Sequence, residues 1–143
     1  MSKRKIGVLV SGRGSNLQAL MDEIAAGTLN VEITVVISDK KDAFALERAE
    51  KAGIKAVAID RKECVSKEEF ENKITGVLEE AGAELVVLAG FMRILSPEFV
   101  GHWHHKIVNI HPALLPSFPR LAGQGQPPNS RVNIAGYPAP FLY

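Results

Sequence analysis

The feature that most constrains the fold is a regular alternation of short apolar runs with segments whose apolar residues recur at helical spacing. The apolar runs predict strands at residues 6–10, 31–37, 56–59, 85–89 and 107–110. The intervening segments predict helices at residues 17–26, 43–52, 66–81 and 97–101. This order favours an α/β fold with a doubly wound, mostly parallel sheet of Rossmann-type topology and helices on both faces.

Composition narrows the function classes. The chain has 143 residues, of which 46% are hydrophobic, and we expect one globular domain. Its 17 basic and 16 acidic residues are interspersed and leave a net charge of +1, which disfavours nucleic acid and anionic membranes as partners. No apolar run reaches the ~18–20 residues needed to span a bilayer. Cys64 is the only cysteine, which excludes an internal disulfide, and we expect a cytoplasmic protein.

A glycine-rich loop lies between the first predicted strand and the first predicted helix. Gly12 and Gly14 permit a tight turn and close approach of a phosphate, and Ser15 or Asn16 is expected to cap the helix and donate to a ligand. The loop lacks a third glycine, since Leu17 stands there, and no Gly-Lys-Ser/Thr follows, so it matches neither a dinucleotide fingerprint nor a Walker A loop. A phosphate site and a plain structural turn both remain open.

The stretch from residue 108 to 116 places an amide and an imidazole two residues apart, just before Pro112. Period-two alternation points Asn109 and His111 to the same side. An amide that stabilises an oxyanion and an imidazole that moves protons suit acyl transfer through a tetrahedral intermediate. The alternative is a strand end with a solvated histidine.

A third segment, residues 90–95, places apolar groups and exposed backbone after a buried strand. A flat heterocycle can pack there and bond to the backbone, whereas the alternative is an ordinary apolar loop with one solvated arginine. All three segments follow strand ends. Because parallel sheets bind ligands at the carboxyl ends of their strands, we expect them to meet at one edge.

These segments, with Ser-Gly-Arg-Gly-Ser-Asn-Leu at residues 11–17 and Leu-Ala-Gly-Phe-Met-Arg-Ile-Leu at 88–95, resemble the folate-dependent glycinamide ribonucleotide transformylases. The resemblance runs from about Lys5 to Pro119. It implies a formyltransferase-like fold and a transferase of de novo purine biosynthesis. The implied reaction moves a formyl group from 10-formyltetrahydrofolate, the one-carbon cosubstrate, to the amine of glycinamide ribonucleotide.

The resemblance also implies roles for single residues. Asn109 stabilises the oxyanion and His111 donates a proton. The ribose phosphate of the substrate is held by Gly14, Ser15 and Asn16. The reduced folate is bound by Lys67, Met92, Arg93, Ile94, Leu95 and Asn109. The family chemistry uses no metal, and the spacing of His102, His104 and His105 matches no zinc pattern, so we expect no metal site.

Beyond Pro119 the resemblance fails. We expect a formyltransferase N-terminal α/β domain at residues 1–119 and a divergent Pro/Gly-rich tail, irregular or extended, at residues 120–143. No acidic residue follows Glu98, so the family's aspartate downstream of its catalytic histidine has no counterpart. We therefore expect a truncated or frameshifted product with impaired activity and a sheet that is incomplete on its C-terminal side. Its exposed edge predicts a homo-oligomer.

There are three alternatives. In the first, the chain is a catalytically inactive phosphate- or nucleotide-binding module or assembly partner. In the second, it is a related enzyme that shares the Asn-x-His-x-x-Leu-Leu-Pro core, 10-formyltetrahydrofolate hydrolase or methionyl-tRNA formyltransferase; the Ser-Gly-x-Gly-Ser-Asn segment argues against the tRNA enzyme. In the third, it binds a nicotinamide cofactor with Asp39 as the ribose acceptor, and the missing third glycine argues against this.

Overall fold

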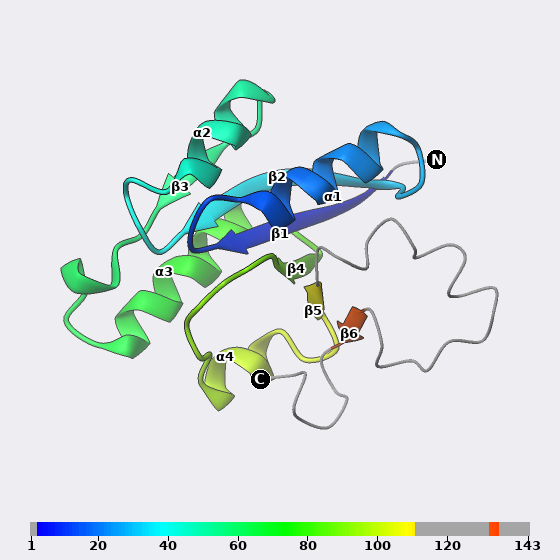
Figure 1. Ribbon diagram of the computed structural model, residues 1–143. Coiled ribbons are helices and arrows are strands. Elements are labelled where there is room, and N and C mark those ends of the chain that lie inside the picture. Colours follow the sequence, from blue (N-terminus) through cyan, green and yellow to red (C-terminus); the bar gives the residue numbers. More distant parts are fainter. Residues whose placement is uncertain (1–2, 111–131, 135–143) are drawn as a thin grey trace.

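A six-stranded sheet forms the centre of the molecule (Figure 1). The structure is a computed structural model that describes residues 3–110 and the backbone of residues 132–134. The strands are β1 (Arg4–Val10), β2 (Val31–Ser38), β3 (Ala56–Ala58), β4 (Leu85–Leu88), β5 (Ile107–Ile110) and β6 (Val132–Ile134). The helices are α1 (Ser15–Ala25), α2 (Phe44–Lys51), η1 (Arg61–Glu63, a 3₁₀ turn), α3 (Lys67–Glu80) and α4 (Pro97–His102).

The order of the strands across the sheet is β3-β2-β1-β4-β5-β6. The first five strands pair in parallel, which confirms the predicted α/β fold with its parallel sheet. The chain builds outward from β1 through β2 to β3, and then returns to the other side of β1 with β4. The direction of winding therefore reverses between β1 and β4, the switch point at which such sheets bind ligands.

One strand was not predicted. β6 pairs antiparallel with β5, with Asn109 opposite Asn133, inside the segment that we expected to be irregular or extended. A strand of three residues is too short to show a period of two. Its formation depends on the backbone of β5 beside it, which a local pattern does not contain.

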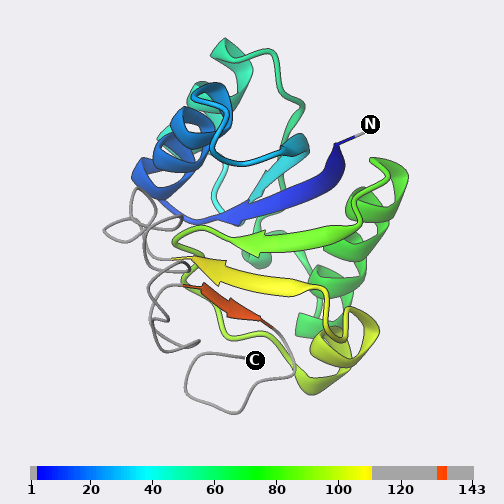
Figure 2. The ribbon, with the colours of Figure 1, turned by 90° about the vertical axis from the view of Figure 1, so that its right-hand side faces the viewer.

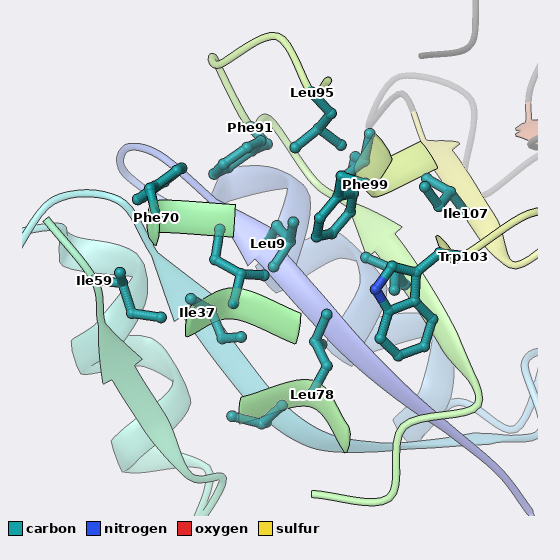
Figure 3. Close-up of a cluster of buried hydrophobic side chains, with 14 of the residues drawn as sticks. Leu9, Ile37, Ile59, Phe70, Leu78, Phe91, Leu95, Phe99, Trp103 and Ile107 are labelled. Atoms are coloured by element: carbon teal, nitrogen blue, oxygen red, sulfur yellow. The ribbon is translucent and has the colours of Figure 1, made fainter. Parts of the chain in front are cut away.

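The sheet separates two hydrophobic clusters (Figure 2). On one face α1 and α2 pack through Leu17, Leu20 and Leu46. On the other face α3 and α4 pack through residues that include Phe70 and Trp103 (Figure 3). Helices on both faces explain why β4 is apolar along its length.

Side-chain caps fix the starts of the two helices on the second face. The Ser66 hydroxyl accepts a hydrogen bond from the Glu69 amide at 3.1 Å, so a Ser-x-x-Glu cap begins α3 where the predicted helix at residues 66–81 begins. Ser96 caps α4 in the same way, through the Phe99 amide at 3.2 Å. The Ser96 cap thus fixes the point where the loop after β4 enters α4, and the Ser66 cap fixes the start of α3.

Candidate functional site

The ends of β1, β4 and β5 lie side by side at the carboxyl edge of the sheet. The register aligns Leu9 with Leu88, and Leu88 with Asn109. The loops that leave β1 and β4 are also joined directly, because the Met92 amide donates to the Ser11 hydroxyl at 2.8 Å. The three segments that the sequence singled out therefore begin at neighbouring positions on one edge.

The loop after β1 turns at Gly14, which has a φ of 85° and is the N-cap residue of α1. Neither Ser15 nor Asn16 caps the helix, contrary to expectation: Ser15 is already the first helical residue, and no side chain caps this end. The reason is tertiary. A Cβ atom at Gly14 would lie 2.7 Å from the Ala45 backbone, so α2 packs against the turn and only glycine fits there.

The uncapped end of α1 carries the features of an anion site. The first backbone hydrogen bond within this helix runs from Gln18 to Gly14 at 2.7 Å, and the amides before it have no partner within the helix. Such amides and the helix dipole attract a phosphate. Asn16 lies next to the loop after β4, since a Cβ atom on Gly90 would be 3.4 Å from the side-chain nitrogen Nδ2 of Asn16.

A pocket of about 290 Å³ adjoins this loop, between the loop and the start of α3. Its lining brings together four of the expected folate-binding residues with two further side chains: Lys67, Met92, Arg93, Ile94, Arg61 and Phe70. Three of these are cationic and none is acidic, so the pocket suits an anionic ligand with an apolar part. Met92 is 79% exposed and Ile94 is 72% exposed, whereas Leu95 is buried in the core (Figure 3).

Arg93 is held by a carboxylate that sequence reasoning assigned to another role. Its Nε donates to Asp39 Oδ2 at 2.7 Å, and its guanidinium carbon lies 5.6 Å from the centre of the Phe70 ring. Asp39 is buried, so it does not stand out toward solvent as a ribose acceptor. The sequence could have predicted a carboxylate partner for Arg93, because this arginine is the one charged residue in an apolar loop and a partly buried charge is usually paired.

Buried polar side chains hold this loop at two further points. The Glu71 carboxylate on α3 accepts from the Ser96 amide at 2.8 Å and from the Ser96 hydroxyl. Ser11, as described above, holds Met92. The residues directly after β1 and β2, and helix α3, thus each supply one buried polar group to the loop or to its immediate flank. The loop after β4 is therefore anchored by three buried side chains.

Asn109 lies on β5, half-buried, between β4 and β6. His111 lies outside the described residues, so its expected role stays a prediction. His102 pairs with Glu79 at 2.9 Å, and the Trp103 indole nitrogen donates to Thr75 at 3.2 Å. Within residues 3–110 there is no group of three or more His, Cys, Asp or Glu side chains arranged to hold a metal ion.

A larger cavity of about 530 Å³ lies between α3 and α4. Its lining includes three carboxylates, Glu68, Glu71 and Glu98, against one lysine, Lys67, and this excess of negative charge does not suit a phosphate or a carboxylate ligand. We therefore place the candidate site at the smaller, cationic pocket. None of the helices that the structure describes is long and apolar enough to cross a membrane.

Fold and site together define a doubly wound α/β domain with an uncapped helix start and a cationic pocket at its switch point. The chain belongs to the formyl transferase family, whose model matches residues 4–138. It is 50% identical over 117 residues to the trifunctional purine biosynthetic protein adenosine-3 of Gallus gallus, covering 82% of this chain and 12% of that protein. It is 44% identical to the phosphoribosylglycinamide formyltransferase of Escherichia coli, covering 81% of this chain and 55% of that enzyme.

The solved structures agree with this assignment. The phosphoribosylglycinamide formyltransferase of Coxiella burnetii superposes with a TM-score of 0.74 at 39% identity, over 87% of this chain and 62% of that one. This chain thus spans about half the length of the bacterial relative from Escherichia coli and a small part of the trifunctional protein.

Proposed function

We propose that this chain transfers a formyl group from 10-formyltetrahydrofolate to the amine of glycinamide ribonucleotide. The observation that carries the proposal is the direct junction of two different subsites, an uncapped helix start and a cationic, partly apolar pocket. The Met92–Ser11 hydrogen bond at 2.8 Å joins the loops that form them. A reaction between a phosphorylated amine and a reduced folate needs this pair of subsites side by side.

The phosphate subsite would be formed by Gly14, Ser15 and Asn16. The amides at the start of α1 would donate to the ribose phosphate, and the positive end of the helix dipole would favour its charge. Gly14 contributes through the shape of the turn, since its φ of 85° sets the direction of the chain into the helix. This subsite would hold the nucleotide so that its amine faces the end of β5.

The folate subsite would be the pocket after β4. Met92 and Ile94 expose apolar side chains that a flat pterin ring would cover, and Leu95 would contribute only its backbone because its side chain is buried. Lys67 and Arg93 line the same pocket, and their charges would attract the carboxylates at the other end of the folate. Asn109 would lie between the two ligands, on β5.

In the reaction, the amine nitrogen attacks the formyl carbon and forms a new C–N bond. The carbonyl oxygen becomes an oxyanion, to which the Asn109 amide donates a hydrogen bond. The amine then loses a proton to solvent, and the carbonyl re-forms as the bond between the formyl carbon and N10 of the folate breaks. N10 takes up a proton from His111, which regains one from solvent. The products are the formylated glycinamide and tetrahydrofolate.

Steady-state formyl transfer by this chain and by two variants tests the proposal. Asn109→Ala removes the oxyanion donor and is expected to lower kcat by about 10²–10³-fold. His111→Ala removes the proton donor and is expected to lower it by about 10²–10⁴-fold. Unchanged turnover in both variants would refute the assignment of this site.

Two further measurements separate the alternatives. Ribonucleotide binding in a calorimeter without any formyl transfer would select a binding module or assembly partner. Formate release from the folate in the absence of ribonucleotide would select a hydrolase.

We also infer that the chain self-associates through a sheet edge. β3 and β6 are the outermost of the strands that the structure describes, and outermost strands offer backbone groups that pair with another chain. Light scattering over a range of concentrations checks this inference, and a monomer at every concentration would exclude it.

A further inference from the structure

The pair formed by Asp39 and Arg93 crosses the candidate site. Asp39 follows β2 and is only 3% exposed, whereas Arg93 lies in the loop after β4 with 36% of its side chain exposed. Their contact spans 54 residues of sequence. The guanidinium is further restricted by the Phe70 ring, 5.6 Å away. A long and flexible side chain is therefore held at two points, and its outer part lines the pocket.

The atom that makes the contact is decisive. A guanidinium has five N–H donors in one plane, and Asp39 engages the one on Nε. Neither terminal Nη group donates to any of residues 3–110. Those two groups form the planar fork that binds carboxylates and phosphates with two parallel hydrogen bonds. Asp39 thus tethers Arg93 by its near side and leaves the anion-binding side available.

The carboxylate itself is imperfectly paired. Within the described part of the chain, Asp39 Oδ1 is buried and accepts no hydrogen bond. A buried acceptor without a donor is costly, and an ion pair kept for stability alone would have both oxygens satisfied. The free-energy cost of the unpaired Asp39 oxygen is expected at a binding site, where the Arg93 guanidinium has to be held in one orientation.

We propose that Asp39 is a positioning residue for the folate subsite. By holding the Arg93 Nε–H, it presents the two terminal amino groups of the guanidinium to the glutamate carboxylates of the folate. This proposal rests on the proposed function for the identity of the ligand. Asp39 itself touches no ligand; it sets the orientation of the group that does.

The test compares two probes, tetrahydrofolate and tetrahydropteroate, which lacks the glutamate, in calorimetric titrations. Asp39→Asn keeps the shape of the side chain and removes its charge, so that the contact to Arg93 becomes a weaker, neutral hydrogen bond. We expect it to weaken tetrahydrofolate binding about five- to tenfold and to leave tetrahydropteroate binding within about twofold. An equal loss for both probes would show that Asp39 only supports the loop, and would overturn the proposal.

Electrostatics alone predicts the opposite sign. Removing a negative charge beside Arg93 makes the pocket more positive and favours an anion. Tighter tetrahydrofolate binding by Asp39→Asn would therefore show that the carboxylate merely neutralises Arg93, and the proposal would fall. The matched control is Asp42→Asn, which makes the same change of charge at an exposed position nearby and is expected to change neither affinity.

Two further variants test whether Asp39 acts on folate binding through Arg93. Arg93→Ala should abolish the preference for the probe with glutamate, and adding Asp39→Asn to Arg93→Ala should then change nothing more. If Asp39→Asn alone does not fold, Arg93→Lys replaces it, since lysine keeps the charge but has no planar fork. Arg93→Lys should show the same selective loss, and an unchanged preference would contradict the proposal.

A readout without ligand separates this proposal from the proposed function. In proton–nitrogen correlation spectra, the Arg93 Nε–H signal should be sharp and slow to exchange in the unaltered chain and broadened in Asp39→Asn. Equal signals in both proteins would overturn the role of Asp39. If the unaltered chain binds neither probe, the proposed function fails, while this spectrum still decides whether Asp39 orients Arg93.

Discussion

Replacing Gly14 with alanine should destabilise the fold, whatever it does to a ligand. The new Cβ atom would lie 2.7 Å from both the Cα and the Cβ atom of Ala45, and the residue would keep a φ of 85°. The left-handed backbone costs about 1–2 kcal/mol for a non-glycine residue. Crowding against a helix backbone adds about 1–3 kcal/mol. The reduced freedom of the unfolded chain returns about 0.4–1 kcal/mol.

The net loss is therefore about 1–5 kcal/mol, which lowers Tm by about 3–20 °C in a chain of this size. Thermal melting followed by circular dichroism measures it. Gly12→Ala is the matched control in the same loop, because its Cβ atom would meet nothing within 4 Å, and its stability should stay within about 0.5 kcal/mol of the original. If Gly14→Ala melts within a degree or two of the unaltered chain, the packing of α2 against the turn is not as described.

Three further changes separate buried from exposed polar contacts. Glu71→Ala removes the buried acceptor of the Ser96 amide and hydroxyl, and should lower the free energy of unfolding in urea by about 2–4 kcal/mol. Hydrogen exchange at the Ser96 amide should become faster. Unchanged exchange there would contradict the role of Glu71 in holding Ser96. Ser66→Ala removes the cap of α3 and should cost about 1 kcal/mol, whereas no loss would mean that another group replaces the cap. A hydrogen bond to Glu63 and, second, the charge of Glu63 raise the pKa of Lys41. The stability that this pair contributes is therefore present below the ordinary lysine pKa and is lost as the pH rises through the raised pKa. Because both side chains are exposed, Lys41→Met should leave Tm unchanged at pH 7.

Local signals predicted the frame of this molecule well. Alternating apolar runs located all five parallel strands, and the fifth matches Ile107–Ile110 at both ends. The start of α3 was predictable because the Ser66 cap and its partner Glu69 lie within one turn of the chain. The rule that ligands bind at the carboxyl ends of parallel strands predicted that the candidate segments begin at one edge of the sheet.

Contacts between distant parts of the chain were not predictable in this way. The pairing of Asp39 with Arg93 joins residues 54 apart, and no periodicity reports such a contact. The N-cap of α1 was predicted wrongly for the same reason, since Gly14 is required by Ala45 on another helix and not by its own neighbours. The role of His111 depends on residues outside those that the structure describes, and it stays a prediction.

The place of β1 in the sheet has a consequence for the order in which the site can form during synthesis. Ser11 leaves the ribosome long before its partner Met92, which follows 81 residues later. At about 5–20 residues per second, the loop after β1 waits roughly 4–16 s for β4 and the loop that follows it. During that interval β1, β2 and β3 have one edge of β1 open where β4 will pair. Ligand capture is thus a late event in the life of the nascent chain, and a chaperone that shields that edge would act in this window.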